Sequence, residues 1–202
     1  MDFTKVKKAL EARGYTVTVC PTKEDAAAYL NKEIDGTSVG FGGSMTLKEL
    51  GLYETIPTHN EFWSHWAPPE GMTPDEARIA AMSTTVYLAS VNGLAETGEI
   101  INIDGFGNRL AGMLFGHEKV YFVVGRNKLA PTYDEALWRA RNIAAPKNAL
   151  RFNVATPCVA NGGKKCFDCK SPERICRGLV VLWRCMMNSD MEVGLVDEDL
   201  GY

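Results

Sequence analysis

The strongest constraint on the fold of this chain is a set of short segments in which nearly every residue is apolar. Residues 119–124 read KVYFVV and residues 86–91 read VYLASV, without the apolar–polar alternation of a half-exposed strand. Strands of this kind need cover on both faces, which is typical of parallel sheets flanked by helices. Predicted helices alternate with these strands. We therefore expect an α/β fold, a three-layer α/β/α arrangement around a largely parallel sheet.

Capping signals place the helices between the strands. Thr22 caps one that ends before Gly36, and Thr73-Pro74-Asp75-Glu76 combines a cap, a proline and first-turn acids. Thr132 and Glu135 predict a capping box for a helix that we expect to end at Pro146. Segment 55–71 is rich in Pro, His and Trp and predicts a long loop or lid. The other predicted elements are helices near 3–14, 46–50 and 107–115, and strands near 15–20, 37–41, 100–103, 179–183 and 191–196.

The length and the net charge limit the classes of protein to which this chain can belong. The 202 residues suit one domain spanning 1–202, with 46% hydrophobic and 23% charged residues, as is usual for a soluble globular chain. A net charge of −3 argues against a nucleic-acid partner. The first residues carry no apolar signal-peptide core, and no run approaches the ~18 apolar residues of a membrane span. We expect a cytoplasmic protein without a membrane partner.

Four of the six cysteines lie close together, in a cysteine-rich segment at 156–177: Cys158, Cys166, Cys169 and Cys176. Disulfides rarely persist in the cytosol, which favours a metal site made of these thiolates. The Cys-x2-Cys pair suits zinc, and four thiolates also suit an iron–sulfur cluster, although the spacing matches no standard ferredoxin run. A redox pair or plain buried thiols are the alternatives.

A glycine-rich turn follows the strand at 37–41. Its backbone N–H groups, the start of the next helix and two hydroxyls suit a phosphate or a carboxylate. The turn is neither a Walker loop nor a dinucleotide fingerprint. The alternative is a tight turn whose hydroxyls cap the helix. The ligand-binding candidates here are Gly42, Gly43, Ser44 and Thr46.

Polar residues gather around four glycines between Asn92 and Arg109. Glu96 suits an acid, base or nucleophile, and Arg109 suits a two-point clamp on a carboxylate or phosphate. The alternative is a hairpin turn at Thr97-Gly98 with local hydrogen bonds. We favour a site in which Glu96 and Arg109 are catalytic, with Asn92, Asp104 and Asn108 as ligand-binding residues.

Lys128 follows the strand at 119–124. Because ligands of open α/β sheets bind at the carboxyl ends of strands, Lys128 is a candidate to attract an anion. The alternative is a solvated basic loop. The sequence thus predicts one cavity at the sheet edge, shared by Ser44, Glu96 and Arg109.

In combination, these segments resemble the lactate-utilisation (LUD-domain) proteins. The resemblance rests on GFGGSMTLKELGL from Gly40, YLASVNGLAETGEIINIDGFGNR (87–109), FVVGRNKL (122–129), RARNIAAPKN (139–148) and TPC…CFDCKSPERIC (156–176). It implies a fold similar to that of sugar-phosphate isomerases and CoA transferases. It also implies an association with oxidation of L-lactate to pyruvate in bacteria, beside iron–sulfur partner subunits. This chain lacks the ferredoxin-type cysteine runs of the larger partners and looks most like stand-alone members.

Three classes of function stay open. The chain binds a small anionic metabolite, as an enzyme or as a subunit in oxidation of lactate or another 2-hydroxy acid. Alternatively it is a redox or regulatory subunit carrying a four-cysteine metal or iron–sulfur site. The third class is a non-catalytic assembly module that docks through the His/Trp loop at 59–66. Homo-oligomer formation is also open.

Overall fold

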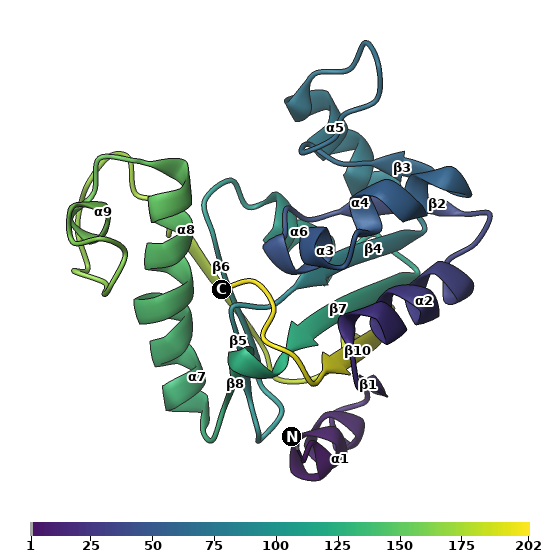
Figure 1. Cartoon of the computed structure of the whole chain (residues 1–202), viewed down its shortest axis with the longest axis horizontal. Coiled ribbons are helices and arrows are strands. Elements are labelled where there is room, and N and C mark those ends of the chain that lie inside the picture. Colours follow the sequence, from purple (N-terminus) through teal and green to yellow (C-terminus); the bar gives the residue numbers. More distant parts are fainter. Residues whose placement is uncertain (1) are drawn as a thin grey trace.

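The structure, a computed structural model, describes residues 2–202. Its centre is a parallel six-stranded sheet with the strand order β1-β10-β7-β4-β2-β3 (Figure 1). Every residue of β4 is buried, as is all of β7 after its first residue, so the predicted two-sided cover and the α/β fold class are confirmed. The strands are β1 (Thr16–Cys20), β2 (Ser38–Phe41), β3 (Glu61–Trp63), β4 (Val86–Ser90), β7 (Lys119–Gly125) and β10 (Asp190–Val196).

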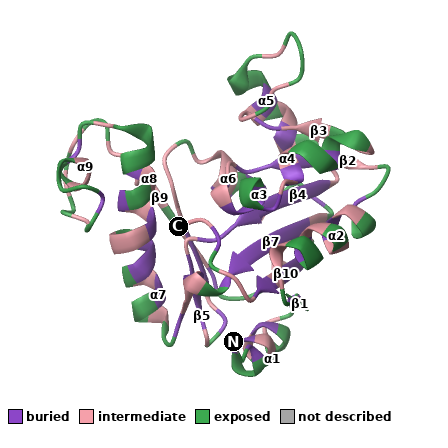
Figure 2. Cartoon of the chain, viewed as in Figure 1, coloured by how far each residue is buried: buried purple, intermediate pink, exposed green. Residues whose placement is uncertain are grey.

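Helices cover the two faces of this sheet, and each face has its own apolar core (Figure 2). Helices α1 (Thr4–Ala12) and α6 (Asn108–Leu114) pack on one face, through side chains such as Leu10 and Met113. On the other face lie α2 (Lys23–Glu33), α3 (Met45–Glu49) and α4 (Leu52–Thr55). Within residues 2–202, no helix is both long and apolar enough to cross a bilayer.

A second, four-stranded sheet was not predicted. It has the order β8-β5-β6-β9, with β5 antiparallel to β6 and parallel to β8, and with β6 antiparallel to β9. Two of its strands have three residues or fewer, too short to show a period in sequence. The strands are β5 (Gly93–Ala95), β6 (Ile100–Asp104), β8 (Leu129–Ala130) and β9 (Gly178–Leu182).

The helix that follows this sheet is longer than expected. Helix α7 (Tyr133–Arg139) runs through a π-helical turn, Ala140–Ala144, into α8 (Ala145–Phe152). The prediction that Pro146 ends the helix is wrong, because Pro146 occupies the first turn of α8, where a missing N–H is tolerated. A short helix, α9 (Pro157–Ala160), follows and opens the cysteine-rich segment.

Segment 55–71 contains more regular structure than a loop. It holds the 3₁₀ turn Ile56–Thr58 and strand β3 at the edge of the main sheet. The predicted helix start at Thr73 is confirmed for α5 (Pro74–Ala80), where Thr73 and Glu76 form a capping box. At Thr132, the side chain caps α7 by accepting from N–H of Glu135 at 3.2 Å. Two further 3₁₀ turns, Ala81–Ser83 and Arg126–Lys128, precede β4 and follow β7.

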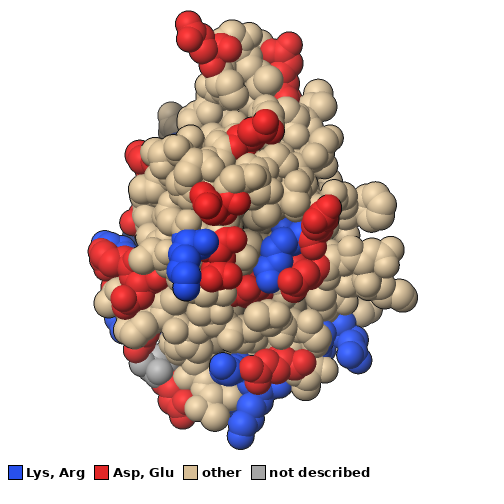
Figure 3. Space-filling view, turned by 90° about the vertical axis from the view of Figure 1, so that its right-hand side faces the viewer, with Lys and Arg blue, Asp and Glu red and all other residues tan. Residues whose placement is uncertain are grey.

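Acidic and basic side chains are mixed on the side of the molecule seen from the right of Figure 1. Figure 3 shows that side, where lysines and arginines alternate with acids and form no continuous basic field. A nucleic-acid backbone needs such a field. This side of the protein therefore gives no support to a nucleic-acid partner.

Candidate functional site

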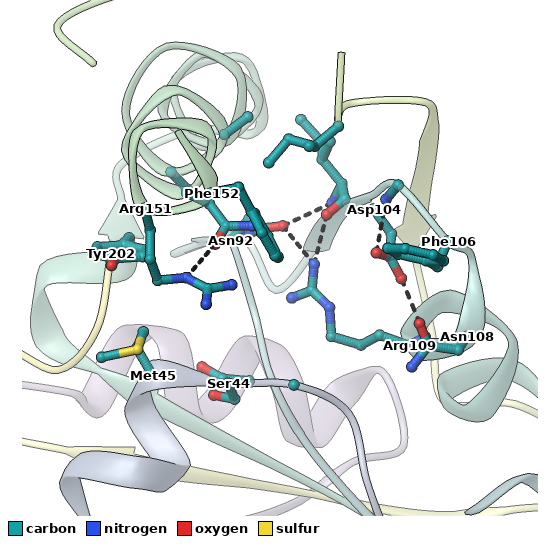
Figure 4. A pocket seen from close by; sticks show the side chains of 18 of the residues that line it. Ser44, Met45, Asn92, Asp104, Phe106, Asn108, Arg109, Arg151, Phe152 and Tyr202 are labelled. Carbon is teal, nitrogen blue, oxygen red and sulfur yellow. Dashed lines mark hydrogen bonds between the residues drawn. The ribbon is translucent and has the colours of Figure 1, made fainter. Parts of the chain in front are cut away.

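A cavity of about 850 Å³ lies at the carboxyl ends of the main-sheet strands. This volume is within the range of small-molecule sites. The turn after β2, the end of β4 and the turn after β7 line it, together with the start of α6 and the end of α8 (Figure 4). The structure brings eight of the predicted site residues to this cavity: Gly43, Ser44, Thr46, Asn92, Asp104, Asn108, Arg109 and Lys128.

Gly42 lies just behind the cavity wall. A Cβ atom there would meet Cγ of Arg109 at 2.9 Å and the hydroxyl of Tyr87 at 3.0 Å. The absence of a side chain thus lets Arg109 pass close to the backbone. The hydroxyl of Ser44 accepts from N–H of Leu47 at 3.3 Å and so caps α3. This is the alternative role, a helix cap, that the sequence left open for Ser44.

The expected location of Glu96 is wrong. Glu96 lies in the turn between β5 and β6, whereas Asn92 and Asp104 lie at the opposite end of the same hairpin and line the cavity. Its carboxylate accepts a hydrogen bond from Lys5 on α1 at 2.7 Å. The predicted catalytic role of Glu96 beside Arg109 gains no support from this position.

Arg109 enters the cavity from the first turn of α6 (Figure 4). Its guanidinium donates to side-chain oxygens of Asn102 at 3.0 Å and Asn92 at 3.2 Å, and to the carbonyl of Ile103 at 2.5 Å. Asp104 accepts from the backbone N–H of Arg109, and no carboxylate in residues 2–202 forms an ion pair with the guanidinium. Burial lowers the pKa of Arg109, yet an arginine stays charged at neutral pH.

Lys128 is 3% exposed and lines the same cavity. Its Nζ donates to hydroxyl oxygens of Thr46 at 2.7 Å and Ser90 at 2.8 Å. Burial, and then the charges of Arg139 and Arg109, lower the pKa of Lys128 well below its ordinary value. Arg139 lies nearby, and burial lowers its pKa to about 10.

The cavity wall is rich in positive charge. Of its lining side chains within residues 2–202, six are lysine or arginine and two are acidic. Arg151 lies over the rings of Trp66 at 5.0 Å and Phe152 at 4.1 Å, which fixes one cation beside aromatic surface (Figure 4). The lysine and arginine residues are Arg78, Arg109, Lys128, Arg151, Arg174 and Arg177, and the acids are Asp104 and Glu173.

His65 lines the cavity, although the sequence pointed only to its loop, 59–66, as a docking surface and not to this residue as part of the anion site. Burial, and then the charge of Arg78, lower the pKa of His65 to about 4, and its Nδ1 is buried without a hydrogen-bond partner. A Cβ on Gly43 would lie 2.9 Å from both His65 and Trp66, so this loop packs directly on the glycine turn. His59, from the same loop, hydrogen-bonds elsewhere, to Asp35 at 3.0 Å.

The four clustered cysteines are free thiols of intermediate exposure. Arg174 holds their segment in place by donating to the carbonyls of Cys169 at 2.6 Å and Cys176 at 3.0 Å. No group of three or more potential metal ligands gathers anywhere in residues 2–202. The zinc or iron–sulfur site stays a prediction. The same segment supplies Glu173, Arg174, Ile175 and Arg177 to the cavity wall.

Together, these features define an α/β protein with a cation-rich cavity at the carboxyl edge of a parallel sheet. The family model of the LUD domain matches residues 3–195, and the chain belongs to the LUD-domain family. A crystal structure of a DUF162 family protein from Deinococcus radiodurans has a similar fold, with a TM-score of 0.52 and 14% identity over 97% of this chain and 99% of that chain. At this identity the likeness concerns the fold alone. A search of the curated proteins found no match.

Proposed function

We propose that this LUD-domain protein binds a small organic anion in the cavity. The observation that carries the proposal is Arg109, a half-buried guanidinium that donates only to neutral oxygen acceptors, in a cavity lined by more basic than acidic side chains. Burial disfavours the charge of Arg109, and the charge of Asp104 offsets only part of this effect. A bound anion offsets the remainder.

The proposed ligand is a 2-hydroxy acid or its 2-oxo counterpart, such as lactate or pyruvate. Membership of the LUD-domain family supports a protein of the lactate-utilisation type. Three of the five N–H groups of Arg109 have acceptors within residues 2–202, which leaves two for a carboxylate. In this proposal the chain binds the acid, and iron–sulfur partner subunits accept the electrons of its oxidation.

Titration calorimetry of the full chain with L-lactate and with pyruvate tests this proposal. We expect both to bind, more weakly at high salt, and lactamide, the neutral counterpart of lactate, not to bind. Arg109→Gln is expected to weaken binding at least about tenfold, equal to about 1.4 kcal/mol.

The matched control is Glu96→Ala, which removes a charge outside the cavity and is expected to leave the affinity unchanged. Thermal unfolding of both variants checks that they are folded. Equal binding of lactamide and lactate, or an unchanged affinity in Arg109→Gln, would contradict the proposal.

A second candidate function is redox or metal-dependent regulation of the same cavity. It is favoured by one observation, that the segment bearing the four cysteines also supplies four residues of the cavity wall. Anaerobically prepared protein is assayed for iron and zinc, and its lactate affinity is measured before and after thiol alkylation. Regulation predicts a bound metal or an altered affinity. The absence of both effects contradicts it.

A further inference from the structure

The hydrogen bonds of Lys128 match a neutral amine. The hydroxyl of Thr46 donates to the carbonyl of Leu200 at 3.3 Å, and that of Ser90 donates to the carbonyl of Val123 at 2.6 Å. Both hydroxyl oxygens are therefore acceptors for Nζ, at 2.7 and 2.8 Å. A neutral amine has two N–H groups, and both are satisfied here with one lone pair left over. An ammonium would have a third N–H without an acceptor among residues 2–202.

The charges facing Lys128 also oppose protonation. Arg139 and Arg109 both act against a third positive charge at this place, in addition to burial. Glu49 is the acid that acts in favour of it, and its carboxylate accepts from the backbone N–H of Gly201 at 2.8 Å rather than from Nζ. A buried lysine beside other cations is a known way to keep an amine nucleophilic at neutral pH.

We propose that Lys128 is a nucleophilic amine that forms an imine with a small carbonyl compound bearing a carboxylate or phosphate. The inference rests on the proposed anion binding, because Arg109 and the arginines of the wall hold the anionic group. Nζ attacks the carbonyl carbon, a C–N bond forms, and the carbonyl oxygen leaves as water with the two amine protons. The product is a C=N bond, and no electron acceptor or donor is required.

Reductive trapping tests the proposal on the wild-type chain. The protein is incubated at pH 7 with pyruvate and sodium cyanoborohydride, and the adduct is located by intact mass and peptide mapping. Surface lysines are deprotonated to roughly 0.04% at pH 7 for a pKa near 10.4. We expect one adduct per chain, on Lys128, formed at least about tenfold faster than on any other lysine.

Four comparisons sharpen the result. Lys119, which is paired with two carboxylates, serves as the internal comparison and is expected to stay unlabelled. Acetone is a carbonyl compound without an anionic group, and we expect it to label Lys128 at least about tenfold more slowly than pyruvate does. Dihydroxyacetone phosphate tests whether a phosphate can take the place of the carboxylate. Lys128→Arg lacks a primary amine and is expected to give no adduct at this site.

The outcomes separate this inference from the function on which it rests. If calorimetry shows that pyruvate binds, but neither pyruvate nor dihydroxyacetone phosphate modifies Lys128, the imine is excluded and anion binding stands. If neither of these two anions binds, anion binding itself fails. Labelling by acetone at the same rate as pyruvate overturns the requirement for an anionic group. Mapping on the wild-type protein decides the question even if Lys128→Arg fails to fold.

Discussion

Strand β7 has a lysine near each end, half-buried Lys119 and buried Lys128, in opposite electrostatic surroundings. Lys119, its first residue, pairs with Asp190 at 2.8 Å and Glu192 at 3.1 Å. Burial opposes its charge, but hydrogen bonds to these carboxylates outweigh burial and raise the pKa of Lys119. Lys128, just past the other end, meets two hydroxyls, and its pKa is lowered.

At the Lys119 end, the charges are satisfied within the chain. Glu192 is 3% exposed and also accepts from the hydroxyls of Thr18 and Tyr29, each at 2.7 Å. At the cavity end, by contrast, the pKa values of His65, Arg109 and Lys128 are all lowered. The charged groups at one end thus stabilise the fold, whereas burial and neighbouring cations disfavour positive charge at the other. The carboxyl edge is also where open α/β sheets bind ligands.

The largest effect is expected from Lys119→Met, which leaves Glu192 buried without its cation. We expect the free energy of unfolding in urea at pH 7 to fall by about 3 kcal/mol. Because the pKa of Lys119 is raised, its contribution is present below the unfolded value of 10.5 and is lost as the pH rises through the folded value. Lys5→Met, in an exposed pair with Glu96, is the control and should cost under about 0.5 kcal/mol.

The next largest effect is expected on the pH dependence of the free energy of unfolding, through His65 at the cavity end. The pKa of His65 is about 4 in the folded chain against 6.5 unfolded, so the unfolded state binds more protons between these values. Stability should therefore rise with pH across this window, by about 2 kcal/mol once partial exposure is allowed for. His65→Gln should reduce the rise, leaving the share of His117, whose pKa burial also lowers. If the free energy of unfolding of His65→Gln rises with pH as steeply as that of the wild type, this assignment is refuted.

A smaller effect is expected from Ser90→Ala, which removes an acceptor from Lys128. We expect a loss of about 1.5 kcal/mol in the free energy of unfolding, because a buried N–H loses its partner. In a Lys128→Met background the same change should cost about 1 kcal/mol less. Strict additivity of the two substitutions would show that the hydrogen bond between them carries no stability.

The smallest effect is expected from Lys128→Met by itself. Since no carboxylate in residues 2–202 pairs with Lys128, its removal leaves no buried charge unpaired. The hydroxyls of Thr46 and Ser90 keep their bonds to carbonyls. We expect the free energy of unfolding to change by less than about 1 kcal/mol. A loss as large as that of Lys119→Met would mean that both ends of β7 are structural.

Several elements of the fold could be predicted because their signals are local. The apolar runs at 86–91 and 119–124 gave the buried strands, and Thr73 gave the start of α5. The position of Glu96 could not be predicted in this way. Its hairpin has polar residues at both ends, and only the pairing of β5 with β6 shows that Asn92 reaches the cavity while Glu96 lies in the turn.

By itself, the sequence determined which segments must be covered on both faces and that a lysine follows the apolar strand at 119–124. Only the tertiary structure decided which groups that lysine contacts. Thr46 lies 82 residues before Lys128 in the chain, and Asp190 lies 71 residues after Lys119. The charge state of a buried group depends on the atoms that surround it in space and on its distance from water. Neighbours along the chain do not fix either quantity.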